Sequence, residues 1–355
     1  MAFTTSSSAG QSTGALSARS AQRIAIWLFV MCGLVAAMVI VGGATRLTDS
    51  GLSITEWRPV TGAVPPLTQE HWLDEFEKYK TIPEYEQVNF GMSLDEFKTI
   101  YWWEWAHRFL GRLIGVAFMA PLIFFAATGQ MTKIWALKLS GLFVLGGVQG
   151  ALGWWMVSSG LADRVDVSQY RLAAHLGLAV LLFGLMFWFA LDLLPGRKRH
   201  SVSTGLRYGA YALSAGVFAQ IILGAFVAGL RAGRTYNTWP LMDGKFFPEG
   251  YFAGAPQFHH LFETMAAVQF NHRIGAYLLA GGIVWFYLAA RKTALEMRAR
   301  LVICAAALQI ALGVWTVLEA TPLVLGLVHQ AGALVLFSAA LFAAHGAGNS
   351  AAHSG

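Results

Sequence analysis

Long apolar runs alternate with short polar segments along most of the chain. A helix needs about 20 mostly apolar residues to cross the hydrocarbon core of a bilayer. Eight runs of about this length occur, and most of the charged residues lie in the segments between them. The runs lie near residues 24–44, 108–130, 134–157, 172–194, 207–230, 273–290, 300–318 and 323–345. This pattern predicts an all-α polytopic membrane protein with eight transmembrane helices.

The second half of the chain repeats features of the first in the same order. The segment 149–157 matches 309–317 at six of nine positions, and His175 corresponds to His329. Each half contains four spans. Because four is an even number, both halves enter the membrane in the same orientation. We therefore expect two tandem four-helix bundles related by a pseudo-two-fold axis along the membrane normal.

The repeat also divides the chain into units. Each half has a long outer loop after its first span, and loops of such length are usually functional or disordered. In the first loop, Thr68–Tyr79 places aromatic residues at helical spacing and is expected to form an amphipathic helix on the membrane face. The predicted units are a tail at 1–23, a first half at 24–200 with an outer loop at 45–103, a second half at 201–345 with an outer loop at 231–268, and a tail at 346–355.

Composition and charge placement support a membrane protein rather than a nucleic-acid-binding one. The chain is 56% hydrophobic and only 12% charged, with a net charge of +6. The basic residues gather before the first span and in alternate loops, so the positive-inside rule places those segments in the cytoplasm. Both termini are then cytoplasmic, and the two long loops face outward. We expect the lipid bilayer to surround this chain, and we expect no nucleic acid among its partners.

Four of the ten histidines recur between the halves, and they suggest haem ligation. His107, His175, His272 and His329 each lie near the outer end of a span that runs inward. Each half thus presents two imidazoles at similar depth, as a four-helix bundle does to clamp a planar cofactor. Two axial imidazoles complete six-coordinate haem iron. The alternative is that each histidine only hydrogen-bonds a neighbouring helix, but duplication of all four favours ligation.

Charged residues beside these histidines are further candidates. Arg108 and Arg273 follow the histidines of the repeat, and Arg112 lies one turn below Arg108. Guanidinium groups pair with carboxylates, so these arginines are candidate contacts for haem propionates; the alternative is an arginine that reaches water at the interface. Glu104 stands three residues before His107, whereas Gln269 stands at the matching position.

The contrast between Glu104 and Gln269 is a chemical difference between the two halves. A carboxylate accepts or delivers a proton, whereas an amide does not. This asymmetry predicts that the first half performs chemistry, with Glu104 as a catalytic residue, and that the second half holds a cofactor. The alternative for Glu104 is an ion pair with Arg108 at the water interface.

Several motifs together resemble those of the haem A synthase family. They are Gly42-Gly-Ala-Thr-Arg-Leu-Thr-Asp-Ser-Gly-Leu-Ser53, Glu56-Trp-Arg-Pro59, Gly62-Ala-Val-Pro-Pro66, Glu104-Trp-Ala-His-Arg108 and Asn271-His-Arg-Ile-Gly275. The resemblance extends over most of the chain, from about residue 24 to 344, and is strongest to the branch found in mitochondria and alphaproteobacteria. Some bacterial members carry a cysteine pair in the first outer loop. Here the two cysteines, Cys32 and Cys304, both lie inside apolar runs.

The resemblance implies a reaction and a set of ligands. It implies oxidation of the C8 methyl group of haem O, the substrate, to a formyl group through a hydroxylated intermediate, with water as the oxygen source. His107 and His175 would ligate the substrate haem, His272 and His329 a resident haem B, and Glu104 would be the essential carboxylate. All four histidines would thus be ligands of haem iron.

The resemblance also implies partners and a location. Haem O synthase would supply the substrate, cytochrome oxidase assembly would use the product, and an electron acceptor that the sequence does not identify would take the electrons. We expect an integral protein of the bacterial inner membrane, or of the mitochondrial inner membrane, with its haem sites toward the outer face. Two other classes need the same four histidines: a dihaem membrane cytochrome b for quinol-linked electron transfer, and a haem transporter or chaperone.

Overall fold

The computed structural model describes residues 16–162, 164–196, 199–253 and 260–347. In these residues the chain forms helices and no strand beyond one isolated bridge between Met242 and Lys245. Eight of the described helices are long and apolar enough to cross a membrane, which confirms the predicted spans. They are α1 (Ala18–Leu47), α4 (Leu94–Ala127), α5 (Lys133–Val157), α6 (Gln169–Leu193), α7 (Thr204–Gly229), α9 (Met265–Ala290), α10 (Glu296–Leu318) and α11 (Leu323–Gly346).

The second spanning helix extends further outward than the apolar run indicates. The run starts near residue 108, whereas α4 begins at Leu94. Ser93 and Glu96 form a capping box, in which each side chain accepts a hydrogen bond from the backbone N–H of the other, and this satisfies donors that the helix start leaves unpaired. The charged residues of this first turn hid the helix from a count of apolar residues. As a result, Glu104 and His107 lie well inside a continuous helix.

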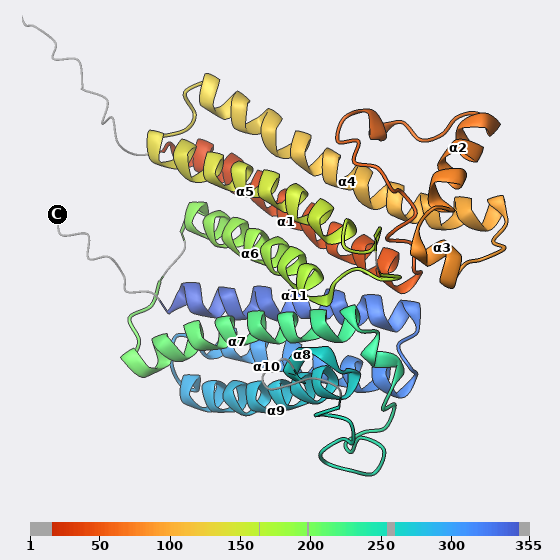
Figure 1. Cartoon of the computed structure of the whole chain (residues 1–355). Helices are drawn as coiled ribbons and strands as arrows, with labels where there is room; N and C mark the ends of the chain where they lie inside the picture. Colours follow the sequence, from red (N-terminus) through yellow and green to blue (C-terminus); the bar gives the residue numbers. More distant parts are fainter. Residues whose placement is uncertain (1–15, 163, 197–198, 254–259, 348–355) are drawn as a thin grey trace, which may run out of the picture.

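The spanning helices form two groups of four that lie side by side (Figure 1). The first group is α1, α4, α5 and α6, and the second is α7, α9, α10 and α11. In each group the first helix packs against the second and fourth, and the third packs against the same two. The groups meet where α6 contacts α7 and α11, and where α1 contacts α11. This shared packing order supports two tandem bundles, while the symmetry axis and the residue bounds of the halves stay predictions.

The core lies at the junction of the two groups. Phe183 and Met186 of α6 and Phe337 and Ala340 of α11 are buried in one apolar cluster. A Cβ at Gly184 would lie 3.0 Å from the Phe337 ring, so the missing side chain lets α11 approach α6 closely. Helices at the periphery instead expose large apolar side chains such as Leu137. That arrangement suits a protein whose outer surface faces lipid.

Short elements of the outer loops cap one end of the bundle. The first loop contains η1 (Thr61–Ala63), α2 (Gln69–Tyr79) and α3 (Pro83–Gln87); the second contains η2 (Ala232–Arg234) and α8 (His260–Glu263). The helix predicted at 68–79 is confirmed as α2, with Thr68 as its N-cap. Its apolar face packs on the outward extension of α4, where the Phe76 and Phe97 rings stack with centroids 4.9 Å apart. The first loop is therefore an ordered cap.

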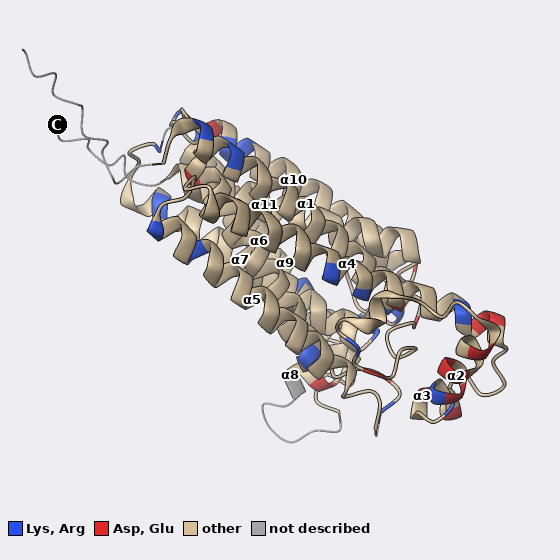
Figure 2. Cartoon of the chain, turned by 90° about the horizontal axis from the view of Figure 1, so that it is seen from above, with Lys and Arg blue, Asp and Glu red and all other residues tan. Residues whose placement is uncertain are grey.

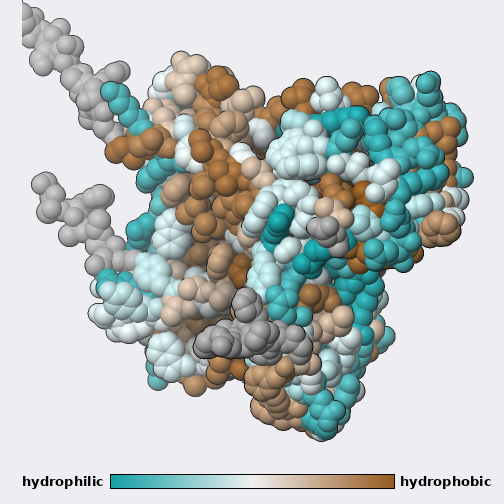
Figure 3. All heavy atoms as spheres, viewed as in Figure 1, coloured by the Kyte–Doolittle hydropathy of each residue, from teal (hydrophilic) through white to brown (hydrophobic). Residues whose placement is uncertain are grey.

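Charge and hydropathy distinguish the two ends of the bundle. Lys and Arg gather at the end that contains the first and last described residues, and most Asp and Glu lie at the opposite end around α2 and α3 (Figure 2). In the space-filling view, hydrophilic residues cover the end that carries α2, whereas apolar residues cover much of the flank (Figure 3). At the first end the His200 N–H donates to the Gly346 carbonyl at 2.8 Å. This distribution follows the predicted positive-inside arrangement.

Candidate haem sites

The two histidines of the first half lie on one cavity. His107 of α4 and His175 of α6 line a cavity of about 640 Å³, together with Glu104, Arg108 and Arg112. The two imidazoles are close enough to interact electrostatically. The structure thus brings together all five first-half residues that the sequence singles out.

The second half has a corresponding pair. His272 of α9 and His329 of α11 also lie close to each other, and both residues are partly buried. Arg273 follows His272, as Arg108 follows His107. The paired arrangement predicted from the repeat is therefore present in both halves.

Each of the four imidazoles faces a glycine on a neighbouring helix. A Cβ at Gly42 would lie 3.1 Å from His107 Nε2, and Cβ atoms at the other three glycines would lie 2.8 to 3.3 Å from the Cε1 atom of the facing ring. These pairs are Gly153 with His175, Gly224 with His272, and Gly313 with His329. The absent side chains leave room around each ring, as close packing of a planar group against the helix would require.

Three glutamines bind three of the four histidines, and sequence reasoning missed them. Nε2 of Gln149 donates to the His175 carbonyl at 2.9 Å, and Gln220 and Gln309 donate to the His272 and His329 carbonyls at 2.8 and 2.9 Å. Nε2 of Gln149 and of Gln220 also lies 3.1 and 3.0 Å from Nδ1 of the same imidazole. We call these three residues the amide anchors. The signal was the spacing Gln-x-x-x-Gly, which occurs on each of their helices.

Glu104 is buried and receives hydrogen bonds at both carboxylate oxygens. Oε2 accepts from the Ser53 hydroxyl at 2.7 Å and from the Ile54 N–H at 2.8 Å, and Oε1 accepts from Arg108. The ion pair that was the alternative for Glu104 is thus present, but the same carboxylate also lines the cavity of His107 and His175. It fixes the start of the outer loop beside the candidate site.

Gln269 occupies the matching place with the opposite polarity. Its Nε2 donates to the carbonyls of Ala232 and Thr235 at 2.9 and 2.7 Å, and its Oε1 accepts from Arg273 at 3.2 Å. Both residues therefore hold the preceding outer loop against the helix. Only Glu104 does so with a group that can carry a charge and bind a proton.

The three candidate arginines donate mainly to outer-loop carbonyls. Arg108 donates to Ile54 and Glu56, and Arg273 donates to Tyr236 and Thr238. Arg112 donates to the carbonyls of Arg58 and Pro59, but its Nη1 is buried with no partner among the described residues. Arg112 lines the cavity, so one donor there is available for an anionic group. Contact of these arginines with propionates stays a prediction.

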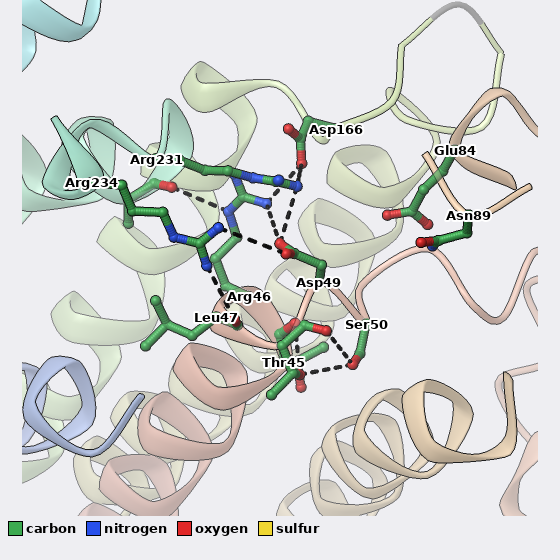
Figure 4. A network of polar contacts seen from close by, with 12 residues as sticks. Thr45, Arg46, Leu47, Asp49, Ser50, Glu84, Asn89, Asp166, Arg231 and Arg234 are labelled. Atoms are coloured by element: carbon green, nitrogen blue, oxygen red, sulfur yellow. Dashed lines mark hydrogen bonds and ion pairs between the residues drawn. The ribbon is translucent and has the colours of Figure 1, made fainter. Parts of the chain in front are cut away.

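A charged network at the outer end joins the two halves (Figure 4). Asp166, in the loop after α5, accepts from Arg46 at the end of α1 and from Arg231 after α7, both at 2.8 Å. Arg231 also pairs with Asp49 at 3.0 Å. Arg46 donates further to the carbonyls of Ala228 and Gly229, both at 3.1 Å. This network is not apparent in the sequence, because its members lie far apart in the chain.

Glu84 of α3 is a second buried carboxylate on the cavity of His107 and His175. In Figure 4 it points toward the space beside Asp49 and Asp166, and no ion pair joins it to the arginines. Burial raises the pKa of Glu84 to about 8, opposed by a hydrogen bond from the Tyr79 hydroxyl and reinforced by Glu104, Asp166 and Asp49. Glu84 is thus a proton-binding group near neutral pH.

The residues of both pairs fit haem. Buried orphan atoms lie beside the rings: Oε1 of Gln149, Oε1 of Gln309 and Nδ1 of His329 have no hydrogen-bond partner in the described part of the chain. A ligating imidazole offers its second ring N–H to such an acceptor. Within the same residues, no group of three or more His, Cys, Asp and Glu side chains is arranged to hold a metal ion. A metal that brings its own planar ligand and takes only two imidazoles from the protein therefore suits these pairs better than an ion ligated by protein side chains alone.

Together the fold and the site define a class of protein: an integral membrane bundle of eight helices with two histidine pairs between its helices. The family model described as cytochrome oxidase assembly protein, COX15-CtaA, matches residues 25–341, and the chain belongs to this family. Relatives named heme A synthase include a protein from Parvibaculum lavamentivorans that is 58% identical over 91% of this chain and 93% of its own length. Others from Nitrosospira multiformis and Maricaulis maris are 53% and 50% identical over 91% and 92% of this chain, and 92% and 97% of their own lengths.

Proposed function

We propose that this protein is a haem A synthase that oxidises the C8 methyl group of haem O to a formyl group. The relatives named heme A synthase support this proposal by their identity over most of the chain. The observation that carries it is the difference between two otherwise similar histidine pairs. A buried carboxylate, Glu104, lies on the cavity of one pair, and an amide, Gln269, stands at the matching position beside the other.

In this proposal the first half binds the substrate. His107 and His175 ligate the iron of haem O within the cavity that they line. Arg112, through its unpartnered Nη1, offers a hydrogen bond to a propionate at the outer end, and Arg108 and Glu104 fix the loop that closes this end. Burial of the substrate between helices excludes bulk water. The water that reacts would therefore be a molecule that has entered the site.

The second half holds a resident haem B between His272 and His329. Bound there, haem B would supply one-electron redox chemistry. The protein's part is to hold His272 and His329 through Gln220 and Gln309, which donate to their carbonyls, and to close the outer end through Arg273 and Gln269. No carboxylate replaces Gln269, so this half is suited to retaining a cofactor rather than to moving protons.

The proposed reaction balances with water as the only oxygen source. A methyl group and one water give a formyl group, four electrons and four protons, through a hydroxymethyl intermediate. The electrons leave to the acceptor, and the protons need basic groups beside the substrate. Glu104 is the carboxylate on the cavity that would accept a proton. The proton would come from water when it attacks the substrate carbon, or from the hydroxyl group when the hydroxymethyl intermediate is oxidised.

Location and partners follow from the same proposal. Both histidine pairs would lie toward the outer face of a bacterial inner membrane, or of the mitochondrial inner membrane, with both termini cytoplasmic. Haem O synthase would deliver the substrate, and cytochrome oxidase assembly would take the product.

Mass identification of the bound pigments tests the proposal. We expect the purified protein to contain haem B together with haem O, its hydroxylated form or haem A. Haem B alone at both sites would favour the dihaem cytochrome. Weak, exchangeable binding of unmodified haem without turnover would favour the transporter.

Single-site variants test the division between the halves. His272→Ala or His329→Ala should deplete haem B, whereas His107→Ala or His175→Ala should deplete the substrate-derived haem and turnover while haem B remains. Equal loss of haem B from all four folded variants would overturn the assignment of one haem to each half.

A further inference from the structure

The three amide anchors have a counterpart in α1 that is not an amide. The spacing Gln-x-x-x-Gly places Gln149 before Gly153, Gln220 before Gly224 and Gln309 before Gly313, and in each case the glycine faces the histidine that the glutamine binds. Gly42 of α1 faces His107 in the same way. The residue four positions before Gly42 is Met38, which also lines the cavity.

Met38 leaves His107 without the hydrogen bonds that restrain the other three histidines. A thioether has no donor and is only a weak acceptor. Within the described residues no side chain is hydrogen-bonded to His107, whereas glutamine amides donate to the carbonyls of His175, His272 and His329 and also lie within hydrogen-bond distance of the His175 and His272 rings. The Met38 Cε atom would lie 3.5 Å from a Cβ at Gly111, so this side chain packs against α4 one turn beyond His107.

In the second half, glycines leave room for the amide anchors that the first half does not provide in the same way. The residue three positions after His272 is Gly275, and the one three positions after His329 is Gly332; a Cβ at either would overlap Oε1 of the neighbouring Gln220 or Gln309. The corresponding residues after His107 and His175 are Leu110 and Leu178. Gln149 donates to the His175 carbonyl although Leu178 stands at this position, so a leucine there does not exclude an amide.

We propose that Met38 makes His107 the exchangeable ligand, so that the first half binds and releases haem while the amide anchors of the second half retain it. This inference rests on the proposed function, because it explains how one half can turn over a substrate that resembles the cofactor of the other. A hydrogen-bonded outer partner fixes the orientation of a ligating imidazole, and its removal typically lowers affinity about 10–100-fold. Met38 is thus a positioning residue that acts through His107.

Haem transfer to apomyoglobin measures the proposed difference without relying on turnover. We expect Gln220→Met to release haem B from the purified protein about tenfold faster or more. Gln149→Met is the matched control, because it removes an amide anchor from the first half; its haem B release should match the parent protein. If Gln220→Met released haem B at the parent rate, the proposal would be overturned.

The reverse substitution is the second arm and decides the matter if Gln220→Met does not fold. Met38→Gln should purify with a larger share of substrate-derived haem and transfer it to apomyoglobin more slowly, because an amide would then hold His107. Met297→Gln, at an exposed position of α10 that does not line this cavity, is its control. Unchanged retention in Met38→Gln would count against the proposal.

Failure of the proposed function and failure of the amide anchors give different results. If His272→Ala kept its haem B, the proposed function would fail. If His272→Ala lost haem B while Gln220→Met retained it at the parent rate, the assignment of haem B would stand and only the role of the amide anchors would be wrong.

Discussion

The Arg108 guanidinium donates two hydrogen bonds to Oε1 of Glu104, from Nε at 3.0 Å and from Nη2 at 2.6 Å. The other carboxylate oxygen accepts from Ser53 and Ile54. Glu104 therefore has two separable properties: it anchors the loop backbone, and it places a proton-binding group on the cavity. Experiments on this residue have to distinguish them.

Glu104→Gln should lower haem A formation about 10²–10⁴-fold, because an amide cannot take a proton. Haem B content should stay near the parent value, since Gln269 shows that an amide can hold an outer loop at the matching position. The two environments are not identical, and this difference adds a structural cost to the substitution. The Gln269 amide donates to carbonyls, whereas Oε2 of Glu104 accepts from two donors.

Ser53→Ala is the control for that cost, because it removes one of the two donors at Oε2 and keeps the carboxylate. Product analysis of both variants should show haem O or a partly oxidised haem accumulating in Glu104→Gln alone. Normal haem A formation in Glu104→Gln would leave Glu104 with an anchoring role only.

The pKa of Glu84 predicts a pH-dependent stability. A glutamic acid in an unfolded chain titrates near 4.3, and burial raises the pKa of Glu84 to about 8 in the folded protein. Between these values the folded state binds more protons, so stability falls as pH rises through this window, by at most about 1.4 kcal/mol per pH unit, and levels off above it.

Glu84→Gln should remove this contribution, since a neutral amide keeps the acceptor for Tyr79. Thermal unfolding in detergent should therefore show a larger gain in melting temperature over the parent at pH 9 than at pH 5. Glu77→Gln, an exposed carboxylate of α2, should show no such trend. A constant difference between Glu84→Gln and parent across this range would contradict the prediction.

Accessibility of introduced cysteines tests the membrane orientation. In a chain with Cys304 changed to Ser, an impermeant thiol reagent applied to intact cells should modify Glu77→Cys in the outer loop. It should not modify Arg291→Cys, in the exposed turn between α9 and α10. Labelling of Arg291→Cys before lysis would reverse the predicted topology.

Arg46→Ala should weaken the joint between the two halves. The substitution removes hydrogen bonds to Asp166 and to the carbonyls of Ala228 and Gly229, and hydrogen bonds to charged groups contribute about 1.5–3 kcal/mol each. We expect a lower melting temperature in detergent. Arg300→Ala, which breaks an exposed pair with Glu296, should have little effect; a similar small effect in Arg46→Ala would show that the joint does not depend on this network.

The sequence was sufficient for the spans and for the histidine pairs, because both depend on local signals. Apolar length marks a membrane helix, and repetition distinguishes His107, His175, His272 and His329 from the other histidines. The same reasoning misplaced the start of α4 at 108, since Asp95, Glu96 and Lys98 make the capped first turns of that helix polar.

Contacts between distant segments were beyond sequence reasoning. Nothing local connects Arg46 with Asp166, or indicates that Glu84 lines the cavity of His107. The amide anchors are an intermediate case: their spacing to a glycine is visible in the sequence, but its meaning depends on knowing which helix faces which histidine.

The joint between the halves also bears on how this chain can change over evolution. Arg46 donates to the backbone of Ala228, and Gln330 donates to the carbonyl of Val39 at 2.8 Å, where the absence of a side chain at Gly43 leaves room for the amide. Every residue brings a carbonyl oxygen, so a mutation at 39 or 228 does not remove the acceptor. These two acceptors thus set no requirement on the side chains at 39 and 228, so the two halves can diverge in sequence at these positions while remaining joined.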